Sequence, residues 1–359
     1  MQGGIHKFLG VALIALLILQ SAAISEETGQ PSGEQIQWYP ALATPERDHW
    51  AVTFSGLVTE NERRPVVSWL AKKLLGFSEE ELGAGERAIF RERTRRFLAD
   101  DETGKRMEVE ILGKRYGFGR TGRNGHFGGT ILLPQETLRP DRQTLRCVVT
   151  SSRRVYTNEV PIFAVARHGI SVVSDIDDTI KISDVRDRDE LMRNTFLRPY
   201  RPVEGLAPVY QAWASHSGAQ FHYVSGSPWQ LFPTLQEFVV TNRFPSGSWH
   251  LRTVRLLGLS ATQLLKTPDA HKRKAIEDLF DRLPDRSFVL VGDSGERDPE
   301  IYGDLARRHP KRVTQILIRD VTNEPIFSER YEKAFKNLPQ GSCVIFKTAE
   351  ELPRSLGLP

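Results

Sequence analysis

Apolar and polar positions follow two different rhythms along the chain, and the clearer one begins after residue 168. Short, almost wholly apolar runs there predict five β-strands, at residues 170–173, 221–224, 287–291, 313–318 and 343–346. Helical spacing of apolar residues between these runs predicts four helices, at residues 204–216, 228–242, 271–282 and 300–309. Apolar strands that alternate with helices indicate an α/β domain whose parallel sheet is covered on both faces.

The preceding region, residues 46–166, is mainly strand-like. Glycines interrupt several of its strand patterns, which suggests bulges or tight bends; the patterns lie at 50–58, 107–112, 116–119, 126–133 and 146–150. Helical spacing over residues 66–75 and 79–98 predicts a helical insertion whose polar side carries Arg91, Arg93, Arg95 and Arg96. We expect a small, sandwich-like β domain at 46–166, followed by a catalytic domain at 167–359.

The first 45 residues carry the features of export. An apolar run at residues 8–19 precedes the small residues Ser21, Ala22 and Ala23, a pattern typical of a secretory signal peptide cleaved after residue 23. A membrane-spanning helix needs about 20 apolar residues, so the alternative of an uncleaved anchor is disfavoured. Residues 24–45 are expected to be a flexible leader. The sequence therefore predicts a periplasmic or secreted protein.

Composition changes this picture little. The 359 residues suggest two domains, and Lys and Arg number 49 against 45 Asp and Glu. The resulting net charge of +4 favours anionic ligands but is too small to indicate a nucleic-acid partner. Cys147 and Cys343 fall in different predicted domains, so they either pair in an oxidising compartment or remain two buried thiols.

An acidic run follows the first apolar strand of the α/β region. Asp175 and Asp177 are separated by one residue, and Thr179 follows. Two carboxylates this close ionise together comfortably only beside a cation, and hard oxygen ligands near a phosphate favour Mg²⁺. A calcium loop is excluded because its sixth and twelfth positions, which require Gly and Glu, are Ile180 and Arg186. An acidic turn or a helix N-cap remains open for the run taken alone.

Three later junctions carry matching chemistry. Ser225 and Gly226 follow the second strand, at what is otherwise a plain helix start; Lys272 opens a helix, with Lys274 as its competitor for a role at the site. Asp293 and Asp298 follow the third strand, where Asp293 is well placed as a metal ligand and Asp298 either ligates or orients bound water. Ligands of parallel sheets bind at the carboxyl ends of the strands, so these groups are expected to share one site.

In this order the motifs resemble the haloacid dehalogenase superfamily, with its D-x-D-x-T run, Ser/Thr, Lys and G-D-x-x-x-x-D motif. More narrowly, residues 174–181, 224–229 and 291–296 resemble the phosphatidate phosphatase catalytic domain of the actin-patch-associated type. The resemblance implies a Rossmann-like parallel sheet of the haloacid dehalogenase type. It implies that Asp175 is the nucleophile and Asp177 the general acid/base. The implied Mg²⁺ ligands are Asp175, the Asp177 carbonyl, Asp293 and Asp298, and the implied substrate-binding residues are Thr179, Ser225, Gly226 and Lys272.

The resemblance also implies the reaction. We expect Mg²⁺-dependent hydrolysis of a phosphomonoester through an aspartyl-phosphate, with phosphatidate converted to diacylglycerol at a membrane surface. Residues 184–220 leave little room for a large cap, although residues 180–202 form a candidate flap; an open site suits a bulky lipid headgroup. The predicted signal peptide keeps two alternatives open: a soluble or protein phosphoester outside the cytoplasm, and a non-catalytic phosphate- or metal-binding module.

Overall fold

The structure is a computed structural model that describes residues 26–27, 33–60, 76, 81–98, 100–122, 124–151, 154–254 and 269–357. The predicted signal peptide at 1–23 and the helical pattern at 66–75 lie outside these residues. Two compact units are present: one takes its described residues from Met1–Arg63 and Ala99–Val165, the other from Arg64–Leu98 and Ala166–Pro359. No helix within the described ranges is both long and apolar enough to cross a membrane.

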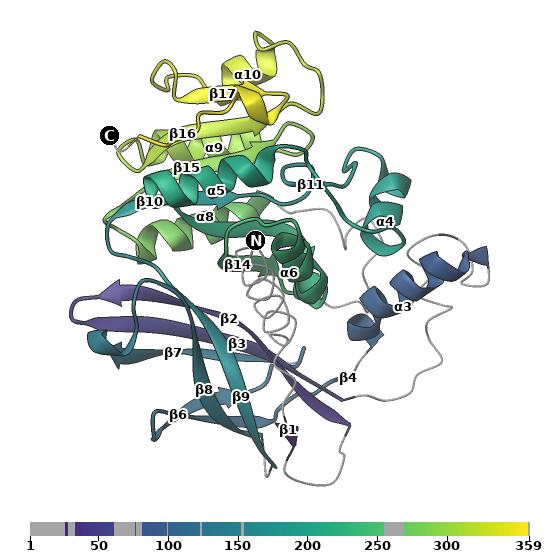
Figure 1. Cartoon of the computed structure of the whole chain (residues 1–359), viewed down its shortest axis with the longest axis vertical. Coiled ribbons are helices and arrows are strands. Elements are labelled where there is room, and N and C mark those ends of the chain that lie inside the picture. The colour runs from purple at the N-terminus through teal and green to yellow at the C-terminus, as the bar shows by residue number, and fades with distance from the viewer. Residues whose placement is uncertain are drawn as a thin grey trace, which may run out of the picture. The chain divides into compact units, whose positions relative to one another are not determined.

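The second unit contains a six-stranded sheet in which every neighbouring pair is parallel (Figure 1). The order is β14-β13-β10-β15-β16-β17. The strands are β10 (Gly169–Ser174), β13 (Gln220–Pro228), β14 (Gly247–Arg252), β15 (Arg286–Asp293), β16 (Val313–Arg319) and β17 (Cys343–Phe346). The five predicted strands and the parallel α/β arrangement are therefore confirmed.

β14 is the strand that the sequence did not reveal. Its residues alternate apolar with polar and include Ser248 and His250, so no apolar run marks it. The strand is nevertheless covered, because Trp249 packs against Tyr223 and Phe232 with ring centroids 5.1 and 5.3 Å apart. Tertiary packing here decides what the local pattern leaves open.

Helices flank this sheet. Those of the core are α5 (Leu206–Ser217), α6 (Phe232–Thr241), α8 (Asp269–Arg282) and α9 (Asp298–Arg308), with shorter elements η3 (Trp229–Leu231), α10 (Glu329–Ala334) and η4 (Ala349–Glu351). α5 lies in front of the strands in Figure 1, whereas α8 contacts α9. α5 is bounded by Gly205 and Gly218, both at positive φ (76° and 59°), a conformation that glycine adopts without a Cβ clash. The four predicted helices are present.

A small flap follows β10, at residues 180–202. Its two ends pair as β11 (Lys181–Ile182) and β12 (Arg201–Pro202), antiparallel to one another, and α4 (Arg188–Phe196) lies between them. Asp187 caps α4 by accepting hydrogen bonds from the N–H groups of Asp189 and Glu190. This is the flap expected from the sequence, with a helix that its charged composition had hidden.

α3 (Ala84–Leu98) belongs to the parallel-sheet unit, although the sequence placed it as an insertion in the β-rich region. Phe90 and Phe97 pack edge-on against Phe196 of α4, with centroids 6.4 and 6.1 Å apart. Arg93 was expected on the polar side of the insertion, which is wrong: it is 5% exposed and donates to the Thr195 carbonyl at 2.7 Å. Helical spacing finds a helix but does not say which unit receives its apolar face.

The first unit contains nine strands connected in one mainly antiparallel sheet, within its described residues. They are β1 (Glu26–Glu27), β2 (Glu34–Glu46), β3 (His49–Glu60), β4 (Asp100–Asp101), β5 (Arg106–Ile111), β6 (Lys114–Arg120), β7 (His126–Pro134), β8 (Asp141–Ser151) and β9 (Arg154–Ala164), with a turn of 3-10 helix, η2, at Gln135–Thr137. Aromatic and aliphatic side chains, among them Trp38 and Phe54, form its core. The five strand patterns of this region are confirmed; strand pairing alone does not establish the sandwich.

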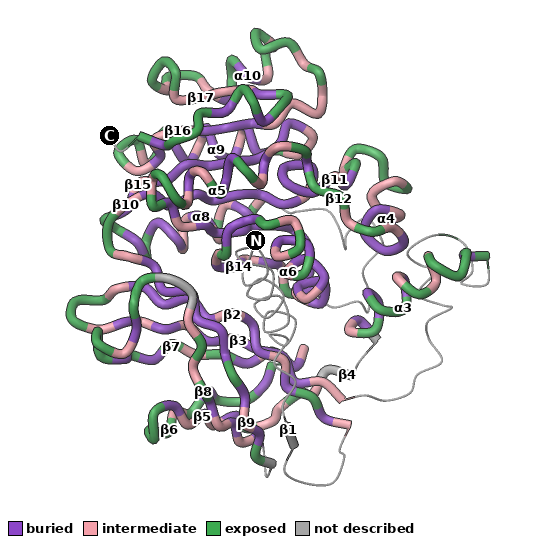
Figure 2. Tube along the Cα trace, viewed as in Figure 1, coloured by how far each residue is buried: buried purple, intermediate pink, exposed green. Residues whose placement is uncertain are grey.

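Two expectations about this unit need revision. The flexible leader predicted for 24–45 is wrong from residue 34 onward, because β2 pairs with β3 and buries Trp38 and Tyr39. The charged composition before these residues masked the apolar stretch that follows. Both cysteines are unpaired thiols, Cys147 buried in β8 and Cys343 half-buried at the start of β17, so the disulfide alternative finds no support. Figure 2 shows how burial follows the strands of both units.

Candidate active site

The polar junctions meet at the carboxyl ends of β10, β13 and β15. Ser174 at the end of β10 is in register with Tyr223 on one side and Val291 on the other. The Asp175 N–H then donates to the Val291 carbonyl at 2.9 Å, which carries the pairing one residue further. Asp175 thus lies beside the loop that begins at Asp293, as expected for adjacent parallel strands.

Asp175 is held by two groups at once. Lys272, from the first turns of α8, places its Nζ 3.0 Å from Asp175 Oδ1, and both side chains are 1% exposed. The Thr179 hydroxyl donates to Asp175 Oδ2 at 3.0 Å. Lys274 faces away, since its side chain is 75% exposed and pairs with Asp278 on the same helix. The geometry decides between the two candidate lysines in favour of Lys272.

Asp293 and Asp298 complete a cluster of buried carboxylates. One carboxylate oxygen from each of Asp175, Asp293 and Asp298 lies within 4.8 Å of the others. Asp298 Oδ1 accepts from Lys272 at 2.5 Å, and its Oδ2 accepts the Asp293 N–H at 3.2 Å. Glu296, which the sequence analysis did not select, also pairs with Lys272 at 3.1 Å. Lys272 therefore serves three carboxylates, counting Asp175.

Burial and crowding shift the pKa values in this cluster. Burial raises the pKa of Asp175 well above its usual range; Lys272 pulls it down, while Asp298, Glu296 and Asp293 push it further up. The pKa of Asp293 is likewise raised well above its usual range by burial and by Asp298. Burial disfavours the charge on Lys272, but its carboxylate neighbours raise its pKa well above the ordinary value. The cluster carries more carboxylates than its lysine neutralises.

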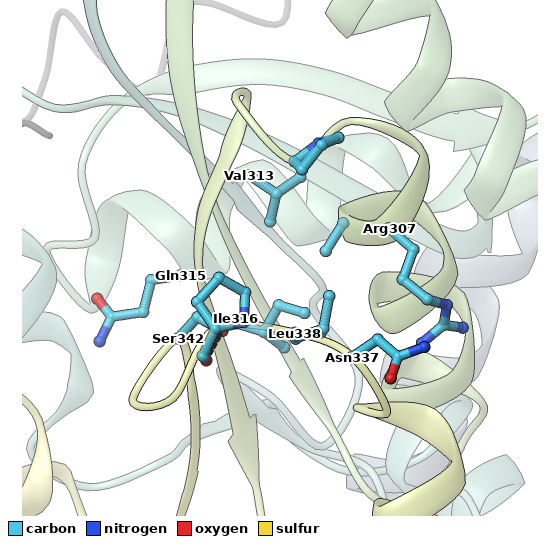
Figure 3. A pocket seen from close by; sticks show the side chains of 10 residues that line it. Arg307, Val313, Gln315, Ile316, Asn337, Leu338 and Ser342 are labelled. Atoms are coloured by element: carbon cyan, nitrogen blue, oxygen red, sulfur yellow. Dashed lines mark hydrogen bonds between the residues drawn. The ribbon is translucent and has the colours of Figure 1, made fainter.

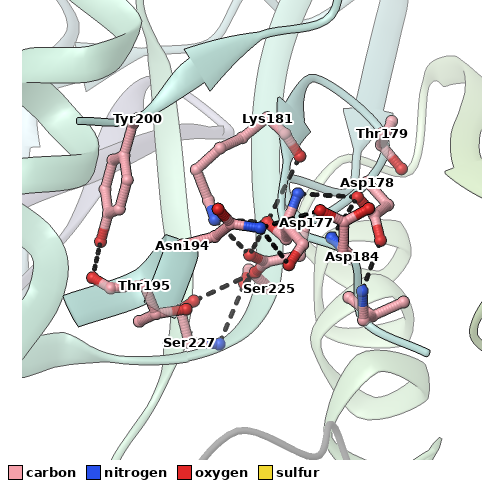
Figure 4. A network of polar contacts seen from close by, with 12 residues as sticks. Asp177, Asp178, Thr179, Lys181, Asp184, Asn194, Thr195, Tyr200, Ser225 and Ser227 are labelled. Atoms are coloured by element: carbon pink, nitrogen blue, oxygen red, sulfur yellow. Dashed lines mark hydrogen bonds and ion pairs between the residues drawn. The ribbon is translucent and has the colours of Figure 1, made fainter. Parts of the chain in front are cut away.

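Asp177 points into a different set of partners, drawn in Figure 4. Its Oδ1 accepts from the buried Lys181 Nζ and from the Ser183 hydroxyl, both at 2.7 Å. Its Oδ2 accepts from the hydroxyls of Ser225 and Ser227, both at 3.1 Å. Burial would raise the pKa of Asp177, but Lys181 and these hydroxyls hold it below its usual value.

The turn between the two aspartates is fixed by Asp178. This residue has φ of 54°, in the left-handed region that aspartate tolerates better than most residues. Its carboxylate accepts the N–H groups of Ser183, Asp184 and Val185 at 2.7, 2.9 and 2.6 Å. Asp178 therefore anchors the start of the flap to the acidic run, a structural role that complements the chemical ones proposed for its neighbours.

The remaining predicted site residues lie in the same place. Ser225 and Gly226 are buried near the end of β13, where the pairing with β14 shifts register between Val224 and Pro228. Ser227 was expected to begin a helix, which is wrong: β13 continues to Pro228 and the Ser227 hydroxyl contacts Asp177. The sequence analysis also missed Lys181 and Ser183. Lys181 stood in the quoted motif, and a lysine two residues after the acidic run was the available signal.

Comparisons with known proteins agree with this geometry. Residues 170–320 match the family model described as phosphatidate phosphatase APP1, catalytic domain. This part of the chain belongs to that family. The matched range contains all the site residues named above.

Two curated relatives extend the similarity to this family. An uncharacterized protein of Schizosaccharomyces pombe is 31% identical over 211 residues, which cover 56% of this chain and 34% of the relative. Phosphatidate phosphatase APP1 of Saccharomyces cerevisiae is 28% identical over 251 residues, 67% of this chain and 42% of the relative. The chain therefore spans about a third to two fifths of the length of these relatives. A sialyltransferase structure from Photobacterium damsela covers 60% of this chain and 37% of its own at 11% identity, but its TM-score of 0.21 supports no argument.

The donor set of this phosphatase-family domain fits a divalent cation. Three carboxylate oxygens converge, and Asp293 Oδ2 is buried without a hydrogen-bond partner among the described residues. Asp293 Oδ1 is oriented by the N–H groups of Gly295 and Glu296 at 2.6 and 3.1 Å, which leaves Oδ2 available. An unpaired buried carboxylate oxygen beside two other carboxylates is the arrangement that a hard cation satisfies.

A cavity of about 300 Å³ lies elsewhere in the same unit (Figure 3). It is lined from the end of α9, from β16 and from the loop before β17, by Ala306, Arg307, Pro310, Val313, Gln315, Ile316, Asn337, Leu338, Pro339 and Ser342. None of the predicted site residues lines it. The chemistry of the APP1-type domain is therefore concentrated at the strand ends and not in this cavity.

Proposed function

We propose that the chain is a Mg²⁺-dependent phosphatase that hydrolyses phosphatidate to diacylglycerol through an aspartyl-phosphate on Asp175. The observation that carries the proposal is the contact of Asp175 with Lys272, at 3.0 Å, inside a cluster of carboxylates at the end of β10. The family of residues 170–320 supports it, as does the name of the yeast relative. The parallel sheet is then a Rossmann-like sheet of the haloacid dehalogenase type.

The reaction follows from the residues in place. The Asp175 carboxylate attacks phosphorus, the bond from phosphorus to the ester oxygen breaks, and that oxygen leaves with the electron pair and takes a proton from Asp177. A water molecule then attacks the phosphorus and gives a proton to Asp177, which releases phosphate and restores Asp175. Phosphoryl transfer depends mainly on positioning and charge neutralisation, which bound Mg²⁺ would supply together with Lys272.

Different residues hold the two ends of the substrate phosphate in this proposal. Lys272, Thr179, Ser225 and Gly226 bind its oxygens, while Asp175, Asp293, Asp298 and the Asp177 carbonyl hold Mg²⁺. Lys181 and the hydroxyls keep Asp177 ionised in the free protein, which prepares its role as a base. For its role as an acid, Ser225 turns from Asp177 to the phosphate, so that Asp177 takes up a proton as substrate enters.

The cellular setting is a separate proposal. The signal-like segment at 1–23 favours a periplasmic or secreted enzyme, in which a soluble or protein phosphoester competes with phosphatidate for the role of substrate. The chemistry at Asp175 is the same for both substrates. A test must therefore separate the chemistry from the choice of ester.

The test compares phosphatidate vesicles with soluble phosphoesters, with and without Mg²⁺, for the wild type and Asp175→Asn. We expect Mg²⁺-dependent release of phosphate that the substitution lowers about 1,000-fold or more, the scale seen when a nucleophile is removed. Asp278→Asn is the matched control, because Asp278 is half-exposed on α8 and pairs with Lys274. Activity retained by Asp175→Asn would refute the nucleophile, faster turnover of soluble esters would refute the lipid substrate, and no turnover would leave a binding module.

A further inference from the structure

The loop between β16 and α10 carries the most exposed large apolar side chain among the described residues. Phe327 is 81% exposed and its neighbour Ile326 63%. Isolated apolar residues on a surface are normal, but two adjacent ones, next to an exposed Pro325, form a small apolar tip. We call residues 325–327 the apolar tip. Figure 2 marks this stretch as exposed, before the more buried start of α10.

The chain on the amino-terminal side of the apolar tip is bound to the acidic loop after β15. The Ser294 hydroxyl accepts the N–H groups of Val321 and Thr322 at 2.8 and 3.1 Å. Asp320 closes the turn by accepting the Asn323 N–H at 2.8 Å. Ser294 directly follows Asp293, so this side of the loop is attached one residue from the carboxylate cluster.

The chain on the carboxyl-terminal side is bound to the same loop. The Arg330 guanidinium donates to the carbonyls of Ser294 and Glu296 at 2.6 and 2.5 Å. It also pairs with Glu300 at 2.8 Å. The apolar tip is thus a short excursion whose two ends are fastened to the residues that follow Asp293.

Gly295 shows how close this loop lies to the flap. A Cβ placed on Gly295 would lie 3.0 Å from Cγ2 of Val321 and 3.1 Å from Cγ2 of Val185. The start of the β16–α10 loop, the acidic loop and the start of the flap therefore converge beside Asp293. The apolar tip is part of the rim of the proposed active site, on the carboxyl-end side of the sheet.

Ion pairs neutralise the charges around the apolar tip. Glu324 lies 3.7 Å from Arg330, and Glu329 pairs with Lys333 at 2.5 Å. Lys347 is 63% exposed on the adjacent strand end and contacts Asn323 at 3.2 Å. The surroundings are therefore neither a strong anionic barrier nor a basic patch, and apolar burial is the main attraction that this rim offers.

We propose that Ile326 and Phe327 insert into the lipid surface that carries the substrate and hold the rim of the Asp175 site against the phosphate headgroups. The proposal rests on the proposed function, because it assumes a substrate embedded in a bilayer. A protruding aromatic and aliphatic pair on a fastened loop suits a fluid interface, which needs no complementary pocket. The scaffold takes up none of the motion, so insertion fixes the distance from bilayer to nucleophile.

The test measures binding without turnover. The full chain with Asp175→Asn is sedimented with phosphatidylcholine vesicles that contain a minor fraction of phosphatidate, with and without the double substitution Ile326→Ser/Phe327→Ser. Loss of apolar insertion should weaken binding about 10- to 100-fold. Raising the salt concentration should weaken it less than the substitution does. The control is Leu112→Asn, which removes another exposed side chain (65%) at a position of positive φ that asparagine accepts.

A second measurement uses the active chain. The double variant should lower kcat/KM on phosphatidate vesicles by a similar factor and leave turnover of a dissolved short-chain phosphatidate unchanged. Unchanged vesicle binding, an equal loss on dissolved substrate, or a wild-type self-association that the substitution abolishes while vesicle binding persists would each overturn the proposal. A wild type that binds vesicles through the apolar tip but turns over no phosphoester would refute the proposed function and leave the insertion standing.

Discussion

Asp175 and Asp177 are two residues apart, yet their surroundings are opposites. Asp175 shares one lysine, Lys272, with Asp298 and Glu296, and Asp293 lies beside them with an unpaired oxygen. Asp177 has Lys181 to itself and three hydroxyl donors besides. One half of the site has too few positive charges, and the other half is complete.

This difference separates the chemistry in space. A buried group of carboxylates with one lysine gains from a further cation, which is the side where the proposed Mg²⁺ binds. A carboxylate with four donors gains nothing from a metal at its side chain, and its charge is already compensated. Asp177 therefore contributes to the metal only through its carbonyl, and its side chain is left for proton transfer.

The two halves also respond to pH in opposite directions. The raised pKa values of Asp175 and Asp293 mean that the folded chain takes up protons there more readily than the unfolded chain. Their contribution to stability is present at low pH and is lost as pH rises through the raised values. The lowered pKa of Asp177 acts the other way: its contribution is present above the ordinary pKa and is lost as pH falls through the lowered one.

The largest effect is expected for Lys272→Met. Removing the ammonium leaves buried carboxylates without their positive partner, which should cost about 3–5 kcal/mol in free energy of unfolding and abolish phosphatase activity. Added Mg²⁺ should recover part of the lost stability, because the cation occupies the same cluster. Thermal unfolding with and without Mg²⁺ measures both effects.

Lys274→Met is the matched control for this substitution. Lys274 lies on the same helix but is 75% exposed, so its loss should change the free energy of unfolding by about 0.5 kcal/mol or less. Equal effects of the two substitutions would show that Lys272 is an ordinary surface lysine in solution, and the comparison between the two halves would fail.

An intermediate effect is expected for Asp293→Asn. Without metal, the neutral amide relieves repulsion in the cluster, so the variant should unfold at a higher temperature than the wild type. With Mg²⁺ the order should reverse, because a ligand at 100 times its Kd stabilises the wild type by about 2.7 kcal/mol and the variant binds it weakly. Calorimetric titration with Mg²⁺ alone measures the binding directly.

The pH dependence sharpens the test at Asp293. The metal-free advantage of Asp293→Asn should grow as pH rises and vanish near pH 4, since the wild-type carboxyl is protonated there and resembles the amide. Asp189→Asn is the control, because that carboxylate is 83% exposed on α4. An advantage that is the same at all pH values would mean that the amide improves packing and that charge plays no part.

The sequence predicted one half of the site better than the other. Asp175, Lys272, Asp293 and Asp298 each follow a strand or open a helix, so the rule for parallel sheets was enough to bring them together. Lys181 and Ser183 lie in the flap, whose fold depends on Asp178 at positive φ and on its hydrogen bonds to the flap backbone. No periodicity encodes such a turn, and the partners of Asp177 could not be found from spacing.

The same distinction holds for the fold. The five apolar strands of the parallel sheet announced themselves, whereas β14 is held by Trp249 against aromatic partners and β2 by pairing with β3. α3 has helical spacing, but only Arg93 and the contacts with Phe196 show which unit it joins. Elements defined by burial along one segment were predictable, and elements defined by a distant partner were not.

The smallest effect is expected for Lys181→Met. Asp177 loses its charged partner but keeps the hydroxyls of Ser183, Ser225 and Ser227, so the cost should be about 1–3 kcal/mol in free energy of unfolding. Methionine retains most of the contact with the Tyr200 ring, whose centroid lies 4.7 Å from Nζ, so the loss reports mainly the charge. Mg²⁺ should recover none of it, in contrast to Lys272→Met, because this half of the site offers the cation no free carboxylate. Unfolding curves of the two variants at rising Mg²⁺ should therefore diverge, and parallel recovery would mean that Asp175 and Asp177 belong to a single electrostatic cluster.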